Sequence, residues 1–173
     1  MTVVPFVSVE EYRHSHYEPD VDYVDGALEE RNTCLIDHSE IQGELAMIFR
    51  NHRVEWGVDA YLSPRVQVCP TRFRIPDVCV MPAGWRLRGQ KTPLLCLEVK
   101  SEEYNLEREV ARAQDYLQMG VREVWIFDPE TRTAYVLRGE VMTQQRHGAL
   151  KLTDTAIKLD LAALFGVLDE RVA

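Results

Sequence analysis

The stretch PLLCLEVK (residues 93–100) is the most apolar segment of the chain, and it decides the fold. Apolar and polar residues hardly alternate until its last three positions, which is typical of a central strand covered on both faces. Because side chains alternate across a strand, Glu98 and Lys100 project from one face and Val99 from the other. Burying such charges is costly unless they are paired or bind a metal, so their position indicates a functional site.

The segment after this strand predicts a helix and then two more strands. Apolar residues recur at helical spacing and a glycine stands at the C-terminal end of the pattern, at Leu106, Val110, Ala113, Leu117 and Gly120. Residues 123–138 then read as a strand, an Asp-Pro turn and a strand. The order strand, helix, strand favours a parallel pair.

The segments before the central strand predict further elements. Ser8 is spaced to cap a short helix with Glu11, and Asp25-Gly26 is a strong hairpin signal. Residues 37–52 carry the pattern of a first long helix, and residues 58–81 hold strands separated by prolines. Residues 82–92 predict an exposed loop, and the tail from residue 140 predicts one or two weak strands and a short closing helix.

Length and composition fit one globular domain. The chain has 173 residues, of which 46% are hydrophobic and 28% charged, so we expect a single domain over residues 1–173 with its core at about 21–138.

We find no apolar run long enough to cross a bilayer and no signal-peptide pattern, and we expect a cytoplasmic protein with no membrane partner. The four cysteines lack metal-site spacing and are expected to be reduced thiols. The net charge of −8 gives no global sign of nucleic-acid binding.

A second carboxylate precedes Glu98 by one strand. Asp77 opens the strand of residues 77–81, and if that strand neighbours the central one, Asp77 and Glu98 converge. With the backbone carbonyl of Val99 they form an incomplete set of oxygen ligands that suits Mg²⁺ or Mn²⁺. Lys100 would then stand beside the reacting water and phosphate, where positive charge assists phosphodiester cleavage.

Asp77 followed by Glu98-x-Lys100 on consecutive strands resembles the PD-(D/E)XK nuclease superfamily. Within it, the chain resembles the Uma2 family of restriction-endonuclease-like proteins, also called DUF820. The matching stretches are YVDGALEERN (23–32), HSEIQGEL (38–45), FRIPDVCVM (73–81), LLCLEVKSEE (94–103) and YLQMGVREVWIFDPETRTAYVLR (116–138). The resemblance implies an α/β restriction-endonuclease-like fold, with a mixed central sheet flanked by helices, and Mg²⁺-dependent endonuclease activity on DNA with Asp77, Glu98 and Lys100 as catalytic residues.

Three further residues are candidates for the same site. Glu44 flanks the inward stripe of the first long helix and could add a metal-directed carboxylate. His38 lies on that stripe and is either a core residue or part of the site. Arg112 falls on the helix face opposite Leu106 and Val110, where it either binds phosphate or is solvated. The resembling helix tends to carry an acidic residue near position 108, where this chain has Arg108.

Two other functions remain open. The chain could be a non-catalytic DNA-binding or scaffold protein that has kept the nuclease fold, which the net charge of −8 favours. It could also be a metal-dependent hydrolase of small phosphoesters. Arg86, Arg88 and Lys91 in the predicted loop form a candidate contact patch for nucleic acid, with Trp85 beside them for stacking. Because cutting both strands of DNA requires two active sites, we expect a homodimer.

Overall fold

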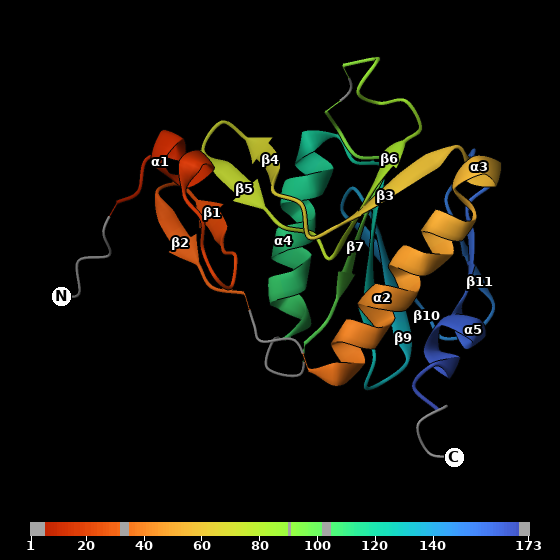
Figure 1. The fold of residues 1–173 in the computed structure, drawn as a ribbon. Coiled ribbons are helices and arrows are strands. Elements are labelled where there is room, and N and C mark those ends of the chain that lie inside the picture. Colours follow the sequence, from red (N-terminus) through yellow and green to blue (C-terminus); the bar gives the residue numbers. More distant parts are fainter. Residues whose placement is uncertain (1–5, 32–34, 90, 102–104, 170–173) are drawn as a thin grey trace.

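A mixed six-stranded sheet forms the centre of the protein (Figure 1). The computed structural model describes residues 6–31, 35–89, 91–101 and 105–169. The strands lie in the order β10-β9-β8-β7-β6-β3, with bounds β3 Val58–Leu62, β6 Val78–Pro82, β7 Leu95–Val99, β8 Glu123–Asp128, β9 Thr133–Arg138 and β10 Val141–Gln145.

Strand β7 lies inside this sheet, as the sequence predicts. All five of its residues are buried. It pairs antiparallel with β6 and parallel with β8, which confirms the parallel strand-helix-strand unit and the mixed sheet. The central strand therefore positions Glu98 against neighbours on both sides.

Helices cover the two faces of the large sheet (Figure 1). Helix α2 (Ile36–Asn51) places Ile41, Leu45 and Phe49 in one core with the β7 residues Leu95 and Leu97. That core also contains residues of the remaining small elements on this side, α3 (Arg53–Trp56), β11 (Ala149–Lys151), β12 (Lys158–Asp160) and α5 (Leu161–Gly166). Helix α4 (Leu106–Met119) packs on the other face, beginning at the Asn105 cap and ending at Gly120 in a left-handed conformation.

A second, smaller sheet flanks α4 on its far side (Figure 1). Its order is β2-β1-β5-β4, built from β1 (Asp22–Val24), β2 (Ala27–Glu29), β4 (Val66–Cys69) and β5 (Arg72–Arg74). The Asp25-Gly26 turn and the Ser8-capped helix α1 (Val9–His14) confirm the sequence predictions. The sequence did not indicate that β4 and β5 leave the main sheet to pair with the hairpin.

Helix α4 packs its predicted apolar stripe against the core, and its polar face is covered as well. Of the predicted inward stripe, only Ala113 is fully buried, whereas Arg112 and Tyr116 are buried on a neighbouring face. The reason is that α4 lies between two sheets, so its polar face is covered as well. Arg112 is therefore not a solvated residue.

The remaining expectations concern the tail, the thiols and the membrane. The tail forms three strands, one more than predicted at most, and the predicted short helix. Cys69, Cys79 and Cys96 are free thiols, while Cys34 lies outside the described residues. In the part of the chain that the structure describes, no helix has the length and apolar character needed to span a membrane.

Candidate functional site

Asp77, which directly precedes β6, lies across from Glu98 of the neighbouring strand β7. The register pairs Val78 with Leu97, so the residue before Val78 and the residue after Leu97 are adjacent and share the α4 face of the sheet. Their exposed fractions are 2% and 1%. Both line one small cavity of about 30 Å³. The structure therefore brings together the two carboxylates that the sequence singled out.

Asp77 is held by three donors from different segments. Arg31 donates to Oδ1 at 2.8 Å, the Val99 N–H donates to Oδ2 at 2.8 Å, and His38 Nε2 lies 3.2 Å from Oδ2. Burial by itself raises the pKa of the Asp77 carboxyl, but the hydrogen bond and charge of His38, the charge of Arg31 and the Val99 N–H hold it below its usual value. Asp77 is therefore an ionised carboxylate that its three donors hold in place.

The pKa of Glu98 is shifted in the opposite direction from that of Asp77. Its Oε1 accepts from Tyr116 at 2.7 Å and from Arg112 at 3.1 Å. Burial nevertheless raises the pKa of Glu98 to about 8; Arg112 opposes this shift, and the nearby charges of Asp77 and Glu109 add to it. Burial, more than the neighbouring charges, therefore favours the protonated form of Glu98.

Glu109 and Arg112 extend the cluster on α4. Glu109 is 5% exposed, lines the same cavity, and lies 3.6 Å from Arg112 Nε. Burial raises the pKa of Glu109. Arg112 also donates to Asp22 of β1 and, at 3.0 Å, to the carbonyl of Ile75. A buried cation thus joins α4 to the small sheet and to the carboxylates of the large one.

Lys100 lies in an adjoining cavity. Its ammonium is 3.3 Å from Asp128 and 4.0 Å from Glu130, and it lines a space of about 120 Å³ that does not include Asp77 or Glu98. His38 and Ser101 line both cavities, so the two spaces share a wall. The three predicted residues are neighbours, but Lys100 does not line the cavity of the two carboxylates.

Two of the three other candidates from the sequence lie in the carboxylate cluster, and one does not. His38 and Arg112 lie in the cluster, whereas Glu44 is half-buried on α2 and does not line this cavity. The sequence reasoning missed Arg31 and Glu109. Glu109 stands next to position 108, where an acidic residue was expected, and allowing a shift of one position would have found it. Arg31 carries no comparable signal because it is brought in from the end of the hairpin.

The donor set suits a hard divalent cation in its chemistry. Two buried carboxylates and the Val99 carbonyl are oxygen ligands, and Mg²⁺ accepts an incomplete protein set because it retains water. The pKa of Glu98 is raised mainly by burial, with smaller contributions from the charges of Asp77 and Glu109, and a bound cation would oppose these shifts. Within the described residues, however, no three or more His, Cys, Asp or Glu side chains form a group able to hold a metal.

Comparisons with known proteins agree with this architecture. A crystal structure described as a putative nuclease belonging to DUF820, from Anabaena variabilis, superposes with a TM-score of 0.80 at 19% identity, covering 94% of this chain and 99% of that one. It shows that the two share a fold. A DrdV–DNA complex matches with a TM-score of 0.44 at 14% identity, over 77% of this chain and 12% of that one.

The family comparison covers nearly the whole chain. No curated protein matches. The model of the Uma2 family, described as "Putative restriction endonuclease", matches residues 9–166. That range includes both sheets, α4 and every residue of the carboxylate cluster. The chain therefore belongs to the Uma2 family.

Proposed function

We propose that this protein is a Mg²⁺- or Mn²⁺-dependent endonuclease that cleaves phosphodiester bonds in DNA. The observation that carries the proposal is the pairing of Asp77 and Glu98 on one face of adjacent buried strands, with a pKa of about 8 at Glu98. Structural carboxylates at this depth are normally neutralised by their partners. Membership of the Uma2 family supports the same assignment.

Each residue of the cluster has a distinct task in this proposal. Asp77, Glu98 and the Val99 carbonyl hold the cation, and Asp77 is kept ionised by its three donors. When bound, a divalent ion supplies Lewis acidity to the phosphodiester. Arg31 and Arg112 fix the carboxylates in the absence of a cation. Lys100, across the shared wall at His38, provides positive charge for the attacking water and the phosphate.

One observation favours the alternative of a non-catalytic DNA-binding or scaffold protein. Arg31 and Arg112 already occupy positions on the two carboxylates where a cation would bind. If these ion pairs never open, no cation can bind the carboxylates, and the protein keeps the nuclease fold without cleavage activity. The net charge of −8 also weakens the general attraction of the surface for DNA.

A binding and cleavage series distinguishes these functions. DNA binding is measured by electrophoretic shift in Ca²⁺, and cleavage follows a switch to Mg²⁺ or Mn²⁺. The nuclease proposal expects binding and cleavage in the native chain, loss of cleavage in Glu98→Gln, and normal cleavage in the control Glu107→Gln, which changes an exposed carboxyl on α4. Binding without cleavage supports the scaffold alternative. Hydrolysis of p-nitrophenyl phosphate without DNA binding supports a small-phosphoester hydrolase.

We propose further that the active form is a homodimer, because cutting both strands of a duplex requires two active sites. Light scattering coupled to size-exclusion chromatography should give a mass near twice 20.0 kDa. A monomeric mass at concentrations that support double-strand cleavage would contradict this proposal.

A further inference from the structure

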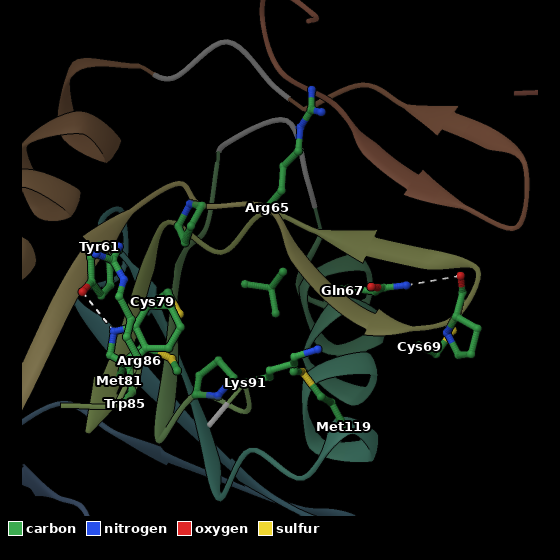
Figure 2. Close-up of a pocket in the computed structure, with 14 residues that line it drawn as sticks. Tyr61, Arg65, Gln67, Cys69, Cys79, Met81, Trp85, Arg86, Lys91 and Met119 are labelled. Carbon is green, nitrogen blue, oxygen red and sulfur yellow. Dashed lines mark hydrogen bonds between the residues drawn. The ribbon is translucent and has the colours of Figure 1, made fainter. Parts of the chain in front are cut away.

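A third and larger cavity lies near the other end of α4 from the carboxylate cluster (Figure 2). Its volume is about 630 Å³. Glu109 lines the carboxylate cavity and Met119 lines this one. They are ten positions apart on α4, which corresponds to a rise of about 15 Å along the helix axis. The two spaces have no lining residue in common. This cavity is therefore a separate site.

Apolar side chains from four parts of the fold form its walls. Val66 of β4, Cys79 and Met81 of β6, Pro93 and Met119 line the interior. The volume falls within the range of about 300–1,000 Å³ that is usual for small-molecule sites. The cavity is thus large enough for a ligand with an apolar body.

A fixed aromatic pair lies at one side of the cavity. The Trp85 Nε1–H donates to the Tyr61 hydroxyl at 3.0 Å, and the two rings lie edge to face with centroids 6.1 Å apart (Figure 2). This hydrogen bond fixes the orientation of the indole. Aromatic side chains held in this way are good stacking partners for flat ring systems, including nucleobases.

The charge of the lining residues is entirely positive. The lining includes Arg65, Arg86 and Lys91 and no acidic residue, although the chain has 28 acidic and 20 basic residues. Arg65 points away from the cavity and is neutralised by Asp20, to which its Nε donates at 2.9 and 3.1 Å (Figure 2). Arg86 and Lys91 are exposed, and among the described residues no carboxylate forms an ion pair with either. Such a cavity selects anions.

We propose that this cavity binds a small ligand with a flat ring system and an anionic group, the chemistry of a nucleotide. The ring lies against Trp85 and the apolar walls, and the phosphate is held by Arg86 and Lys91. Two sources offer this chemistry, a free mononucleotide and one nucleotide of a nucleic-acid strand. The inference does not depend on the proposed cleavage activity.

Calorimetric titration of the full chain with nucleoside monophosphates tests the proposal. EDTA in the buffer prevents metal-bridged binding at the carboxylate cluster. The expected result is saturable binding of at least one nucleotide, weakened at least tenfold in the Arg86→Ala/Lys91→Ala double variant. The matched control is Arg122→Ala, an exposed arginine that does not line the cavity; its affinity should equal that of the native chain.

Three results would overturn the proposal. They are no binding of any nucleotide at millimolar concentration, equal affinity for inorganic phosphate, and equal weakening by Arg122→Ala. Because the double variant could alter the turn, Met119→Trp provides an independent check, since a larger side chain at this wall fills the space. Loss of binding at unchanged melting temperature is expected in Met119→Trp, and retained binding contradicts the assigned site.

Competition identifies the source of the ligand. A short single-stranded oligonucleotide in EDTA should displace the bound mononucleotide if the cavity receives one nucleotide of a strand. In that case Arg86→Ala/Lys91→Ala also weakens oligonucleotide binding. Failure of the oligonucleotide to displace the mononucleotide identifies a free nucleotide as the ligand.

Discussion

Arg112 and Glu98 form an ion pair between α4 and β7 in a region closed to solvent, with 3.1 Å between Nη2 and Oε1. Arg112 also pairs with Asp22 of the small sheet. One guanidinium therefore connects the helix, the central strand and the second sheet. Its removal leaves buried carboxylates without their shared cation.

Arg112→Ala is expected to lower the free energy of unfolding by about 3–5 kcal/mol, the usual cost of breaking a buried ion pair from one side. Arg112→Lys should cost less because it retains the charge while losing the forked geometry. Urea denaturation of both variants checks this, with Arg122→Ala as an exposed arginine control. A loss in Arg112→Ala no larger than that in Arg122→Ala would show that the network contributes little.

Glu98 should make the protein less stable as pH rises. Its pKa is about 8 in the folded chain and 4.5 at its ordinary value, so between these pH values the folded state holds a proton that the unfolded chain has lost. Stability therefore falls across this window, by at most about 1.4 kcal/mol per pH unit. Glu98→Gln removes this dependence. The free energy of unfolding of the variant, compared with that of the native chain, should therefore be more favourable at pH 8 than at pH 5.

Denaturation curves of the native chain and Glu98→Gln in metal-free buffer, recorded from pH 5 to pH 8, measure this difference. The control Glu107→Gln should run parallel to the native chain, because Glu107 is exposed. Parallel curves for Glu98→Gln and the native chain would instead place Glu98 among ordinary, fully paired carboxylates.

Asp77 should behave in the opposite way. Its pKa is lowered in the folded state, so its contribution to stability is present above the ordinary value of 3.8 and is lost as pH falls through the folded pKa. Asp77→Asn should be destabilised by about 1–3 kcal/mol at pH 7, because Arg31 and His38 lose their charged partner. The difference from the native chain should shrink at pH 3. Urea denaturation at both pH values tests this; an Asn variant as stable as the native chain at pH 7 contradicts it.

The central strand and the position of the two carboxylates could be predicted from sequence because each follows from local pattern. The apolar run of β7 defines a buried strand, and period-two alternation places Glu98 on one face. Asp77 required only that its strand be the neighbour of β7, which the register confirms.

The second sheet and Arg31 could not be predicted in the same way. β5 pairs with β1 over a long sequence separation and β4 pairs with β5, and no local signal distinguishes these two strands from those of the main sheet. That pairing covers the polar face of α4 and buries Arg112, which the sequence alone left as either a phosphate-binding or a solvated residue. Arg31 reaches Asp77 from 46 residues earlier in the chain.

Lys100 provides the sharpest test of mechanism, because its removal should cost activity without costing the fold. Its partner Asp128 also accepts from the backbone N–H groups of Glu130 and Thr131 at 3.1 and 3.2 Å, so the carboxylate keeps hydrogen bonds when the lysine is lost. Lys100→Ala should therefore change the free energy of unfolding by only about 1 kcal/mol. If Lys100 assists the attacking water or the phosphate, Mg²⁺-dependent cleavage should fall by about 10²-fold or more while DNA affinity in Ca²⁺ is unchanged.

Single-turnover cleavage and electrophoretic shift on the same preparations measure both quantities. Asp128→Asn is the matched variant, since it removes the ion pair but keeps the lysine, and it should retain cleavage. If Lys100→Ala cleaves at nearly the native rate, the positive charge comes from elsewhere, and Arg112 is the buried cation in contact with Glu98. Arg112→Ala in the Lys100→Ala background then decides the matter: loss of cleavage in a folded double variant assigns the role to Arg112, and retained cleavage shows that neither side chain supplies the charge on which the reaction depends.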